Sequence, residues 1–344
     1  RVIDSHIHLW PPSPTHPEYP PWIPPSSNQS SYPRSIDDYT RATNPHGISP
    51  VRTAVYVETD RPIGLGADVT ALGEWAAGPL AEAQFIREVV ETQRESDVPI
   101  KGLVLWAPVD RGVESFKAYV ELLKGKLGTT FGLVKGWRFL LQGLEMEELK
   151  KVVEGEGFEK VLGECRGRWA FDVGVDARGK GVWQLESVVE VVERFNLGHD
   201  TGVTFVLNHL CKPDMIQSPT TPKQKSDFER WKTCITRFAK VKAVYMKLSG
   251  AFSEMPDQDP ARPQCAEDII YHMRPWLDHV FAAFGPERIM FGSDWPVCNM
   301  RGPGADRSWR HWRDVVKQAL DVYGLSDKEK DRIWFGTADE AYRL

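Results

Sequence analysis

Cysteine is scarce in this chain of 344 residues. The five cysteines are widely spaced and odd in number, and no Cys-x-x-Cys motif occurs. This pattern argues against both a disulfide framework and a zinc site built from thiolates. We expect reduced thiols at Cys165, Cys211, Cys234, Cys265 and Cys298.

Long apolar runs and basic stripes are also missing. The longest apolar stretches, such as Val203 to Leu207 and Val280 to Phe284, are far shorter than the ~18 residues of a membrane-spanning helix. The net charge is −5 and the Lys and Arg residues are scattered, so no basic stripe is available for a phosphate backbone. We therefore expect neither a membrane span nor a nucleic-acid partner. The first residues do not form a charged and then apolar leader, so we expect a cytoplasmic protein.

Short β-branched runs alternate with segments of helical periodicity along the chain. The eight strand-like runs are Val2 to His8, Thr53 to Thr59, Ile100 to Val109, Val134 to Phe139, Trp169 to Val175, Thr204 to Leu210, Ala243 to Gly250 and Arg288 to Trp295. The helical segments include Leu80 to Glu95, Val113 to Leu123, Met146 to Glu154, Leu185 to Phe195, Phe228 to Phe238, Asp268 to Phe284 and a closing helix, Asp327 to Tyr342.

Eight such units favour a closed parallel (β/α)₈ barrel, a TIM barrel, that takes residues 1–344 as one domain. An open doubly wound sheet is the alternative, but no Gly-x-Gly-x-x-Gly turn follows the first strand. Eight prolines lie between Pro11 and Pro25, and further loops rich in proline and charge follow strands six to eight. We expect these segments to form long loops at the C-terminal face of the barrel.

Two histidines end the first strand. The strand period of two sends Asp4, His6 and His8 to one face, which in a barrel points inward near the mouth. Asp294 ends the eighth strand, which closes against the first, so we expect this carboxylate beside the histidine pair. His209 ends the sixth strand at the same height. The alternatives are hydrogen-bonded structural histidines and a turn aspartate before a proline.

Other polar and aromatic side chains end strands as well. Arg138, on strand four, could bind a substrate oxygen or form a salt bridge at the rim. Lys247, on strand seven, could bind substrate or pair with a buried acid, and Glu58 is a candidate for that acid or for a further metal ligand. Trp10 and Trp295 are candidates for stacking on a substrate ring, and their alternative is packing of the barrel.

Five motifs follow one another along the chain: Asp4-Ser-His-Ile-His-Leu-Trp10, Lys135-Gly-Trp-Arg138, Asn208-His-Leu-Cys-Lys-Pro213, Lys247-Leu-Ser-Gly250 and Phe291-Gly-Ser-Asp-Trp-Pro296. Together they resemble the amidohydrolase-2 family, and within it the branch of sugar-lactone and 2-pyrone-4,6-dicarboxylate lactonases. The resemblance covers the barrel from the first strand to the last. It implies hydrolysis of a lactone ring by a water activated near Asp294.

The chain departs from that branch at several positions. Asn208 and Cys211 stand where aspartate and glycine are usual, and Phe139 stands where histidine is common. The binuclear pattern of the superfamily needs a histidine on strand five, which this strand lacks. This absence argues against two metals and leaves one or none.

The preferred hypothesis is a lactonase that opens a sugar (aldono) lactone. Asp294 takes a proton from water, while His6 and His8, with Asp294, hold one divalent ion, Zn²⁺ being the first choice. His209 orients the substrate or completes the ligand set. Without a metal, the three histidines and Arg138 would stabilise the oxyanion.

Two other functions stay open on the sequence alone. One is a metal-dependent decarboxylase of an aromatic or unsaturated acid, which the resembled family also includes. The other is a barrel that binds sugars without catalysis. Among the arginines, only Arg138 sits on a predicted strand end, which favours a neutral sugar lactone over a dicarboxylate. The only partner we expect is this small-molecule lactone, and the sequence indicates no oligomeric state.

Overall fold

The computed structural model describes residues 1–11, 34–44, 47, 49–196, 202–216 and 218–344. Eight parallel strands pair in chain order to form one sheet. They are β1 Val2–Ile7, β2 Val51–Val57, β3 Ile100–Trp106, β4 Val134–Leu140, β5 Ala170–Gly174, β6 Thr204–Leu207, β7 Val244–Leu248 and β8 Ile289–Phe291. A parallel bridge between Ile7 and Trp295 joins the last strand to the first, so the sheet closes into the predicted (β/α)₈ barrel.

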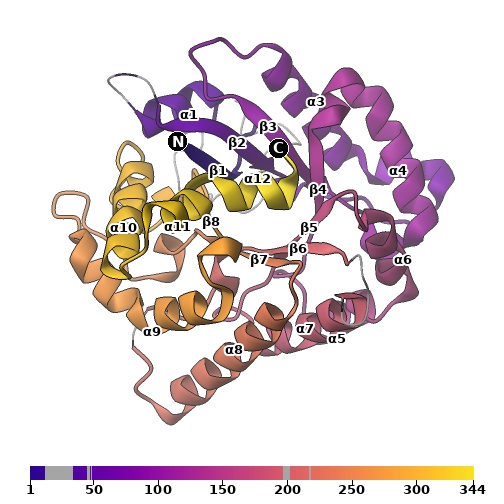
Figure 1. The fold of residues 1–344 in the computed structure, drawn as a ribbon. Coiled ribbons are helices and arrows are strands. Elements are labelled where there is room, and N and C mark those ends of the chain that lie inside the picture. Colours follow the sequence, from indigo (N-terminus) through magenta and orange to yellow (C-terminus); the bar gives the residue numbers. More distant parts are fainter. Residues whose placement is uncertain (12–33, 45–46, 48, 197–201, 217) are drawn as a thin grey trace.

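Helices surround the strands on the outside of the barrel (Figure 1). They are α1 Ile36–Thr43, α2 Leu72–Trp75, α3 Ala77–Glu91, α4 Gly112–Leu127, α5 Met146–Val153, α6 Glu156–Cys165, α7 Trp183–Asn196, α8 Pro222–Lys240, α9 Ala266–Phe284, α10 Ser308–Val322, α11 Asp327–Asp331 and α12 Thr337–Tyr342. All the predicted helices are present, and the structure adds α1, α2, α6 and α10, which were not predicted. Helix α8 begins six residues before its predicted start, because Thr221 and Gln224 form a capping box and Pro222 occupies the first turn.

Several strands end before their predicted last residue. The sixth was expected to reach Leu210, but β6 ends at Leu207, since residues 209–212 have a left-handed backbone that cannot continue a ladder. The eighth was expected to reach Trp295, but β8 ends at Phe291. The residues just beyond both strands therefore form turns at the mouth, where their side chains can converge.

The barrel interior is filled, and one end of it is covered by the C-terminal helix. Inward-facing strand residues such as Ile3, Val104 and Val206 form a cluster with Ala338 and Tyr342 of α12. Several cluster members lie near the N-terminal ends of their strands, so α12 lies across the end opposite the mouth (Figure 1). The predicted closing helix is thus confirmed, with a π-helical turn over Arg332–Gly336 inside it.

The prediction that Asp4 shares the inner face with the histidines was wrong. Its carboxylate accepts hydrogen bonds from Tyr39 Oη at 2.7 Å and Trp309 Nε1 at 2.8 Å, which belong to the outer helices α1 and α10. It also accepts from the backbone N–H of Ser293 at 2.8 Å. The register between β1 and β2 shifts between Asp4 and Ile7, which breaks the simple alternation on which the prediction depended.

The remaining composition-based predictions concern thiols, membranes and loops. All five cysteines are free, and four of them are buried. Within the described ranges, no helix has the length and apolar character needed to cross a membrane. Most of the proline-rich loop after the first strand lies outside the described residues.

Replacing Asp4 with alanine should lower the free energy of unfolding by about 3 kcal/mol. The variant leaves the buried Tyr39 hydroxyl and Trp309 indole N–H without their acceptor, and each such loss costs ~1 to 3 kcal/mol. Urea unfolding measures the change. The control is Asp331→Ala, which removes a half-exposed ion pair with Arg1 and should cost less than about 1 kcal/mol. Equal effects of the two variants would contradict the bridging role of Asp4.

Candidate active site

Three imidazoles and one carboxylate converge at the mouth of the barrel. His6 and His8 come from the end of β1, His209 follows β6, and Asp294 follows β8. The Oδ1 atom of Asp294 lies 3.5 Å from Nε2 of His8, 3.6 Å from Nε2 of His6 and 3.7 Å from Nε2 of His209. The Nε2 atoms of His6 and His8 are 3.1 Å apart, and all four residues are buried. The structure thus brings together the four residues expected at the active centre.

The backbone at two of these residues is left-handed. His209 has φ 54° and Asp294 has φ 58°, a conformation that non-glycine residues rarely adopt and that clusters at functional sites. Gly250, with φ 63°, leaves the space for the His209 ring, because a Cβ there would lie 2.6 Å from Nδ1 of His209. The Oγ atom of Ser249 lies 2.8 Å from the same nitrogen and fixes the ring.

Burial keeps two of the imidazoles neutral. Burial, together with the charge on Lys247, holds the pKa of His6 well below its usual value. Burial also lowers the pKa of His209 to about 3, although the charge on Asp294 opposes the shift. Burial opposes ionisation of Asp294, but His209, His8 and Lys212 outweigh it and hold its pKa below the usual value. The site therefore presents an ionised carboxylate to neutral rings near pH 7.

The donor set suits a single divalent ion. One ligand atom from each of His6, His8 and Asp294 lies within 4.8 Å of the others. Nδ1 of His8 lies 2.8 Å from the carbonyl oxygen of Val57, which can only accept, so the ring proton sits on Nδ1 and Nε2 presents its lone pair. Two imidazole nitrogens with one carboxylate oxygen are a common set for zinc, and His209 stands close enough to add a fourth group.

Glu58 is held by other partners and does not join this group. Arg138 donates to it from Nε at 2.5 Å and also donates to its carbonyl oxygen at 2.6 Å. The prediction of Glu58 as a metal ligand is therefore not supported. For Arg138, the sequence left open a substrate ligand or a salt bridge at the rim, and the structure shows the salt bridge. The neighbouring Asp60 lines a cavity at the mouth of the barrel, and burial, together with the charge on Glu58, raises the pKa of Asp60 to about 7.

The prediction that Lys247 binds substrate is not supported by the structure. Its side chain is fully buried and does not line the cavity at the mouth. Its Nζ lies 2.6 Å from Oδ2 of Asp172 and 3.1 Å from Nδ1 of His6. The buried acid expected for Lys247 is thus Asp172 of β5 and not Glu58. An isolated acid within the apolar strand-five run was the signal that could have identified it.

Trp10 and Trp295 do not serve as stacking surfaces in this structure. Their exposed fractions are 1% and 0%, and neither lines the cavity. The ring of Trp295 packs edge-on against Tyr39 with 5.4 Å between centroids. Both rings instead pack within the barrel, which was the alternative interpretation, and neither leaves a ring face accessible to a substrate.

The cavity beside Asp294 has a volume of about 260 Å³. Arg178, Glu254 and Lys212 form one wall, and Arg178 donates to Glu254 at 2.5 Å. Further lining residues are His8, Asp60, Arg138, Leu140, Gln142, His209, Ser253, Val297, Met300 and Arg301. Sequence reasoning missed Asp60, Arg178 and Glu254, since they lie in loops whose positions no periodicity defines.

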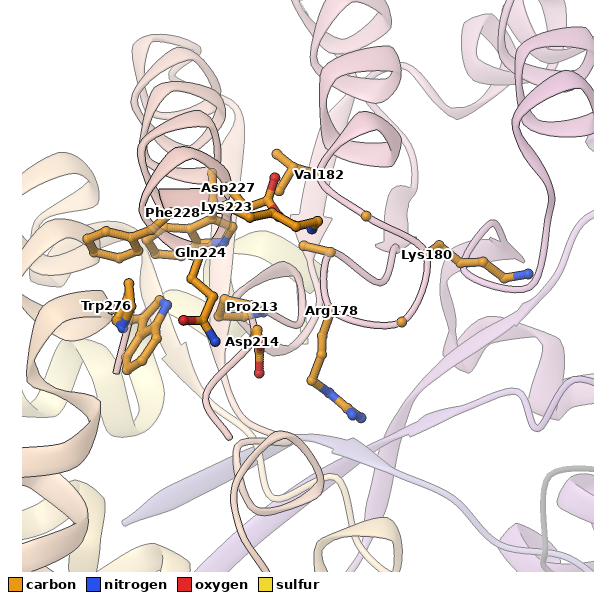
Figure 2. A pocket seen from close by; sticks show the side chains of 15 residues that line it. Arg178, Lys180, Val182, Pro213, Asp214, Lys223, Gln224, Asp227, Phe228 and Trp276 are labelled. Atoms are coloured by element: carbon orange, nitrogen blue, oxygen red, sulfur yellow. The ribbon is translucent and has the colours of Figure 1, made fainter. Parts of the chain in front are cut away.

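A second cavity of about 320 Å³ lies between the loop after β5 and helix α8 (Figure 2). Its lining includes Asp214, Gln224 and Phe228, and it shares Arg178 with the first cavity. In Figure 2 the Arg178 side chain extends away from the α8 residues. None of the four converging residues lines this space, so we place the chemistry in the first cavity.

Comparison with known proteins finds sugar lactonases of similar sequence and an amidohydrolase of similar fold. The chain is 28% identical to an L-rhamnono-gamma-lactonase of Scheffersomyces stipitis, over 100% of this chain and 99% of that protein. An L-fucono-1,5-lactonase of Burkholderia multivorans is 33% identical over 153 residues, which are 44% of this chain and 47% of the relative. A solved amidohydrolase from Burkholderia multivorans with bound zinc shares the fold, with a TM-score of 0.71, 23% identity and coverage of 100% and 99%.

A family model described as amidohydrolase matches residues 162–344, which is more than half of the chain. This segment contains β5 to β8 and two of the four converging residues, His209 and Asp294. The chain belongs to this amidohydrolase family.

Proposed function

We propose that this protein hydrolyses the ring ester of a sugar lactone. The observation that carries the proposal is an ionised Asp294 facing three imidazoles at the wall of a cavity large enough for a small ring. The two relatives described above are both named as sugar lactonases, which supports the choice of substrate class.

Asp294 performs the proton transfers. Its carboxylate accepts a proton from water as the water oxygen attacks the ester carbonyl, and it returns the proton to the ring oxygen when the carbon–oxygen bond breaks. One water is consumed, and the product is a hydroxy acid. The low pKa of Asp294 keeps it ionised at neutral pH, although it also makes this carboxylate a weak base.

The histidines surround the carbonyl oxygen on which negative charge develops during the attack. A divalent ion held by His6, His8 and Asp294 would polarise the ester carbonyl and lower the pKa of a bound water. His209 lines the cavity with its neutral ring held by Ser249, and it orients the carbonyl for attack. Arg138 adds a positive charge at the same wall.

The charge balance of the cavity favours a neutral, hydroxylated substrate. Arg138 is paired with Glu58, and Arg178 with Glu254, which also lies 3.9 Å from Nζ of Lys212. Arg301 lies 3.3 Å from Asp257. A dicarboxylate would require cations to leave these partners, whereas sugar hydroxyls can accept from and donate to groups that are already paired.

Asp294→Asn should reduce kcat by ~10² to 10⁴-fold without unfolding the protein, because the amide cannot act as a general base. Asparagine also tolerates the left-handed backbone at this position. Steady-state kinetics and a thermal melt measure the two effects. The control is Asp214→Asn, an exposed acid at the second cavity that should leave kcat unchanged. Near-wild-type turnover in folded Asp294→Asn protein would remove Asp294 from the mechanism.

His6→Ala and His8→Ala should each lower bound metal below one ion per chain, because each removes one of a few ligands. Metal analysis of protein purified without chelator is the measurement. His279→Ala, on the distant helix α9, should keep the wild-type metal content. Full activity of the wild type after exhaustive chelation would show that the reaction does not need the ion.

A neutral aldonolactone should have a kcat/KM at least about tenfold above that of 2-pyrone-4,6-dicarboxylate, a difference of ~1.4 kcal/mol in transition-state binding. The reason is that the cavity arginines already have carboxylate partners. A pH-indicator assay with both substrates measures the ratio. A tenfold preference for the dicarboxylate would overturn the choice.

The same assay, with carbon dioxide measured in parallel, separates hydrolysis from decarboxylation. Ring opening releases a proton and no gas, whereas a decarboxylase acting on an aromatic or unsaturated acid would release carbon dioxide. Gas release without lactone opening would reject the proposed function.

A further inference from the structure

One carboxyl group in the cavity beside Asp294 has no partner among the described residues. Asp60 lines this cavity together with Asp294 and His8, and its side chain makes no hydrogen bond and no ion pair within the part of the chain that the structure describes. The other carboxylates of the cavity wall are different. Asp294 faces three imidazoles, and Glu254 pairs with Arg178. The Asp60 carboxyl is therefore available to a ligand.

The main chain alone fixes the position of Asp60. Its backbone N–H donates to Oε2 of Glu58 at 2.5 Å. Oε1 of Glu58 accepts from Nε of Arg138 at 2.5 Å, and Nη2 of the same guanidinium donates to the carbonyl oxygen of Glu58 at 2.6 Å. Arg138 thus binds Glu58 with two of its nitrogens, and the turn after β2 holds Asp60 without using the Asp60 side chain.

The fold does not require a carboxyl at this position. Asp60 has φ 56°, which glycine and asparagine tolerate as well as aspartate does. In many turns an aspartate side chain accepts from a backbone N–H two residues further on, but Asp60 accepts from none in the described ranges. Burial and the charge on Glu58 raise its pKa to about 7, as expected for a carboxyl without a compensating donor. A role toward a bound ligand therefore explains the carboxyl better than a role in the fold does.

The surroundings of Asp60 restrict the chemistry of that ligand. A ligand carboxylate would face repulsion from Asp60 and from Glu58 beside it, and a ligand cation would face Arg138 and Lys212 on the same cavity wall. A hydroxyl group avoids both conflicts. A carboxyl binds hydroxyls in either protonation state, because the ionised form accepts hydrogen bonds and the protonated form both accepts and donates.

We propose that Asp60 is a specificity-determining residue that binds hydroxyl groups of the sugar ring while Asp294 acts at the ester. The inference rests on the proposed lactonase function and names the group that recognises the hydroxyls of its substrate. Such a hydrogen bond is present in both the bound substrate and the transition state. Its loss therefore raises KM and leaves kcat close to the wild-type value.

Two substitutions of Asp60 test this role. Asp60→Gly removes the side chain, whereas Asp60→Asn keeps an uncharged side chain that can still hydrogen-bond to a hydroxyl. Both residues tolerate the left-handed backbone, so we expect folded proteins, which a thermal melt checks. The matched control is Asp68→Asn, an exposed position on the same loop that loses the same charge. Asparagine can keep the hydrogen bond that Asp68 accepts from the backbone N–H of Thr70.

The substrates are an aldono-1,4-lactone and γ-butyrolactone, which is the same five-membered ring ester without hydroxyl groups. Asp60→Gly should lose ~10- to 100-fold in kcat/KM for the aldonolactone, nearly all of it in KM, because a hydrogen bond to a charged group contributes about that factor. Asp60→Asn should lose about three- to tenfold, since neutral hydrogen bonds are weaker. With γ-butyrolactone both variants should stay within about twofold of the wild type. Asp68→Asn should match the wild type with both lactones.

A binding measurement keeps the test independent of turnover. The probe is the matching aldono-1,4-lactam, a ring amide that keeps the hydroxyl groups and resists hydrolysis. Calorimetry should show that Asp60→Gly binds it ~10- to 100-fold more weakly than the wild type and Asp68→Asn do.

A wild-type KM for the aldonolactone in folded Asp60→Gly protein would overturn the proposal. Equal losses with the two lactones would also overturn it, because they would indicate a role at the ester, such as proton transfer. A wild type that opens neither lactone would reject the proposed function, and the lactam affinities would then decide the role of Asp60. Weaker binding by Asp60→Gly would support that role, whereas equal binding, or no binding by the wild type, would overturn it.

Discussion

Closure of the barrel between its first and last strands is the constraint on which the site depends. The backbone N–H of Asp294 donates to the carbonyl oxygen of His6 at 2.9 Å, and that of His8 donates to the carbonyl oxygen of Trp295 at 2.8 Å. These two bonds align residues almost 290 positions apart in the chain. The closure places the Asp294 carboxylate directly against the histidine pair, and the turn after β6 then adds His209.

Burial gives this arrangement its chemical character. Burial lowers the pKa of the His6 and His209 imidazoles, so both rings are neutral near pH 7. The surrounding imidazoles and Lys212 hold the pKa of Asp294 below its usual value, so its carboxylate stays ionised beside these rings. The arginines that line the cavity have carboxylate partners within the chain, as in the pairs of Arg138 with Glu58 and of Arg178 with Glu254. The result is a polar cavity suited to a ring that carries hydroxyl groups and no charge.

Much of this structure follows from sequence patterns that reflect local physics. Strand periodicity and strand order predicted the barrel, and strand ends placed His209 and Asp294 at one mouth. The irregular register of β1 turned Asp4 outward, which periodicity cannot foresee. The pairing of Lys247 with Asp172 depends on how far each residue lies along its strand inside the barrel, and Arg178 reaches the cavity from a loop. Both depend on tertiary packing, although the isolated acid in the apolar strand-five run marks Asp172 as a candidate partner.

The central claim is that the cavity beside Asp294 is where a lactone is opened. The most direct test is a crystal structure of the Asp294→Asn variant soaked with an intact aldonolactone, since this variant should bind the ring without hydrolysing it. The account predicts the ester carbonyl in the cavity lined by His8, His209 and Arg138, within contact of residue 294. A lactone bound instead in the cavity between Arg178 and helix α8 would contradict it.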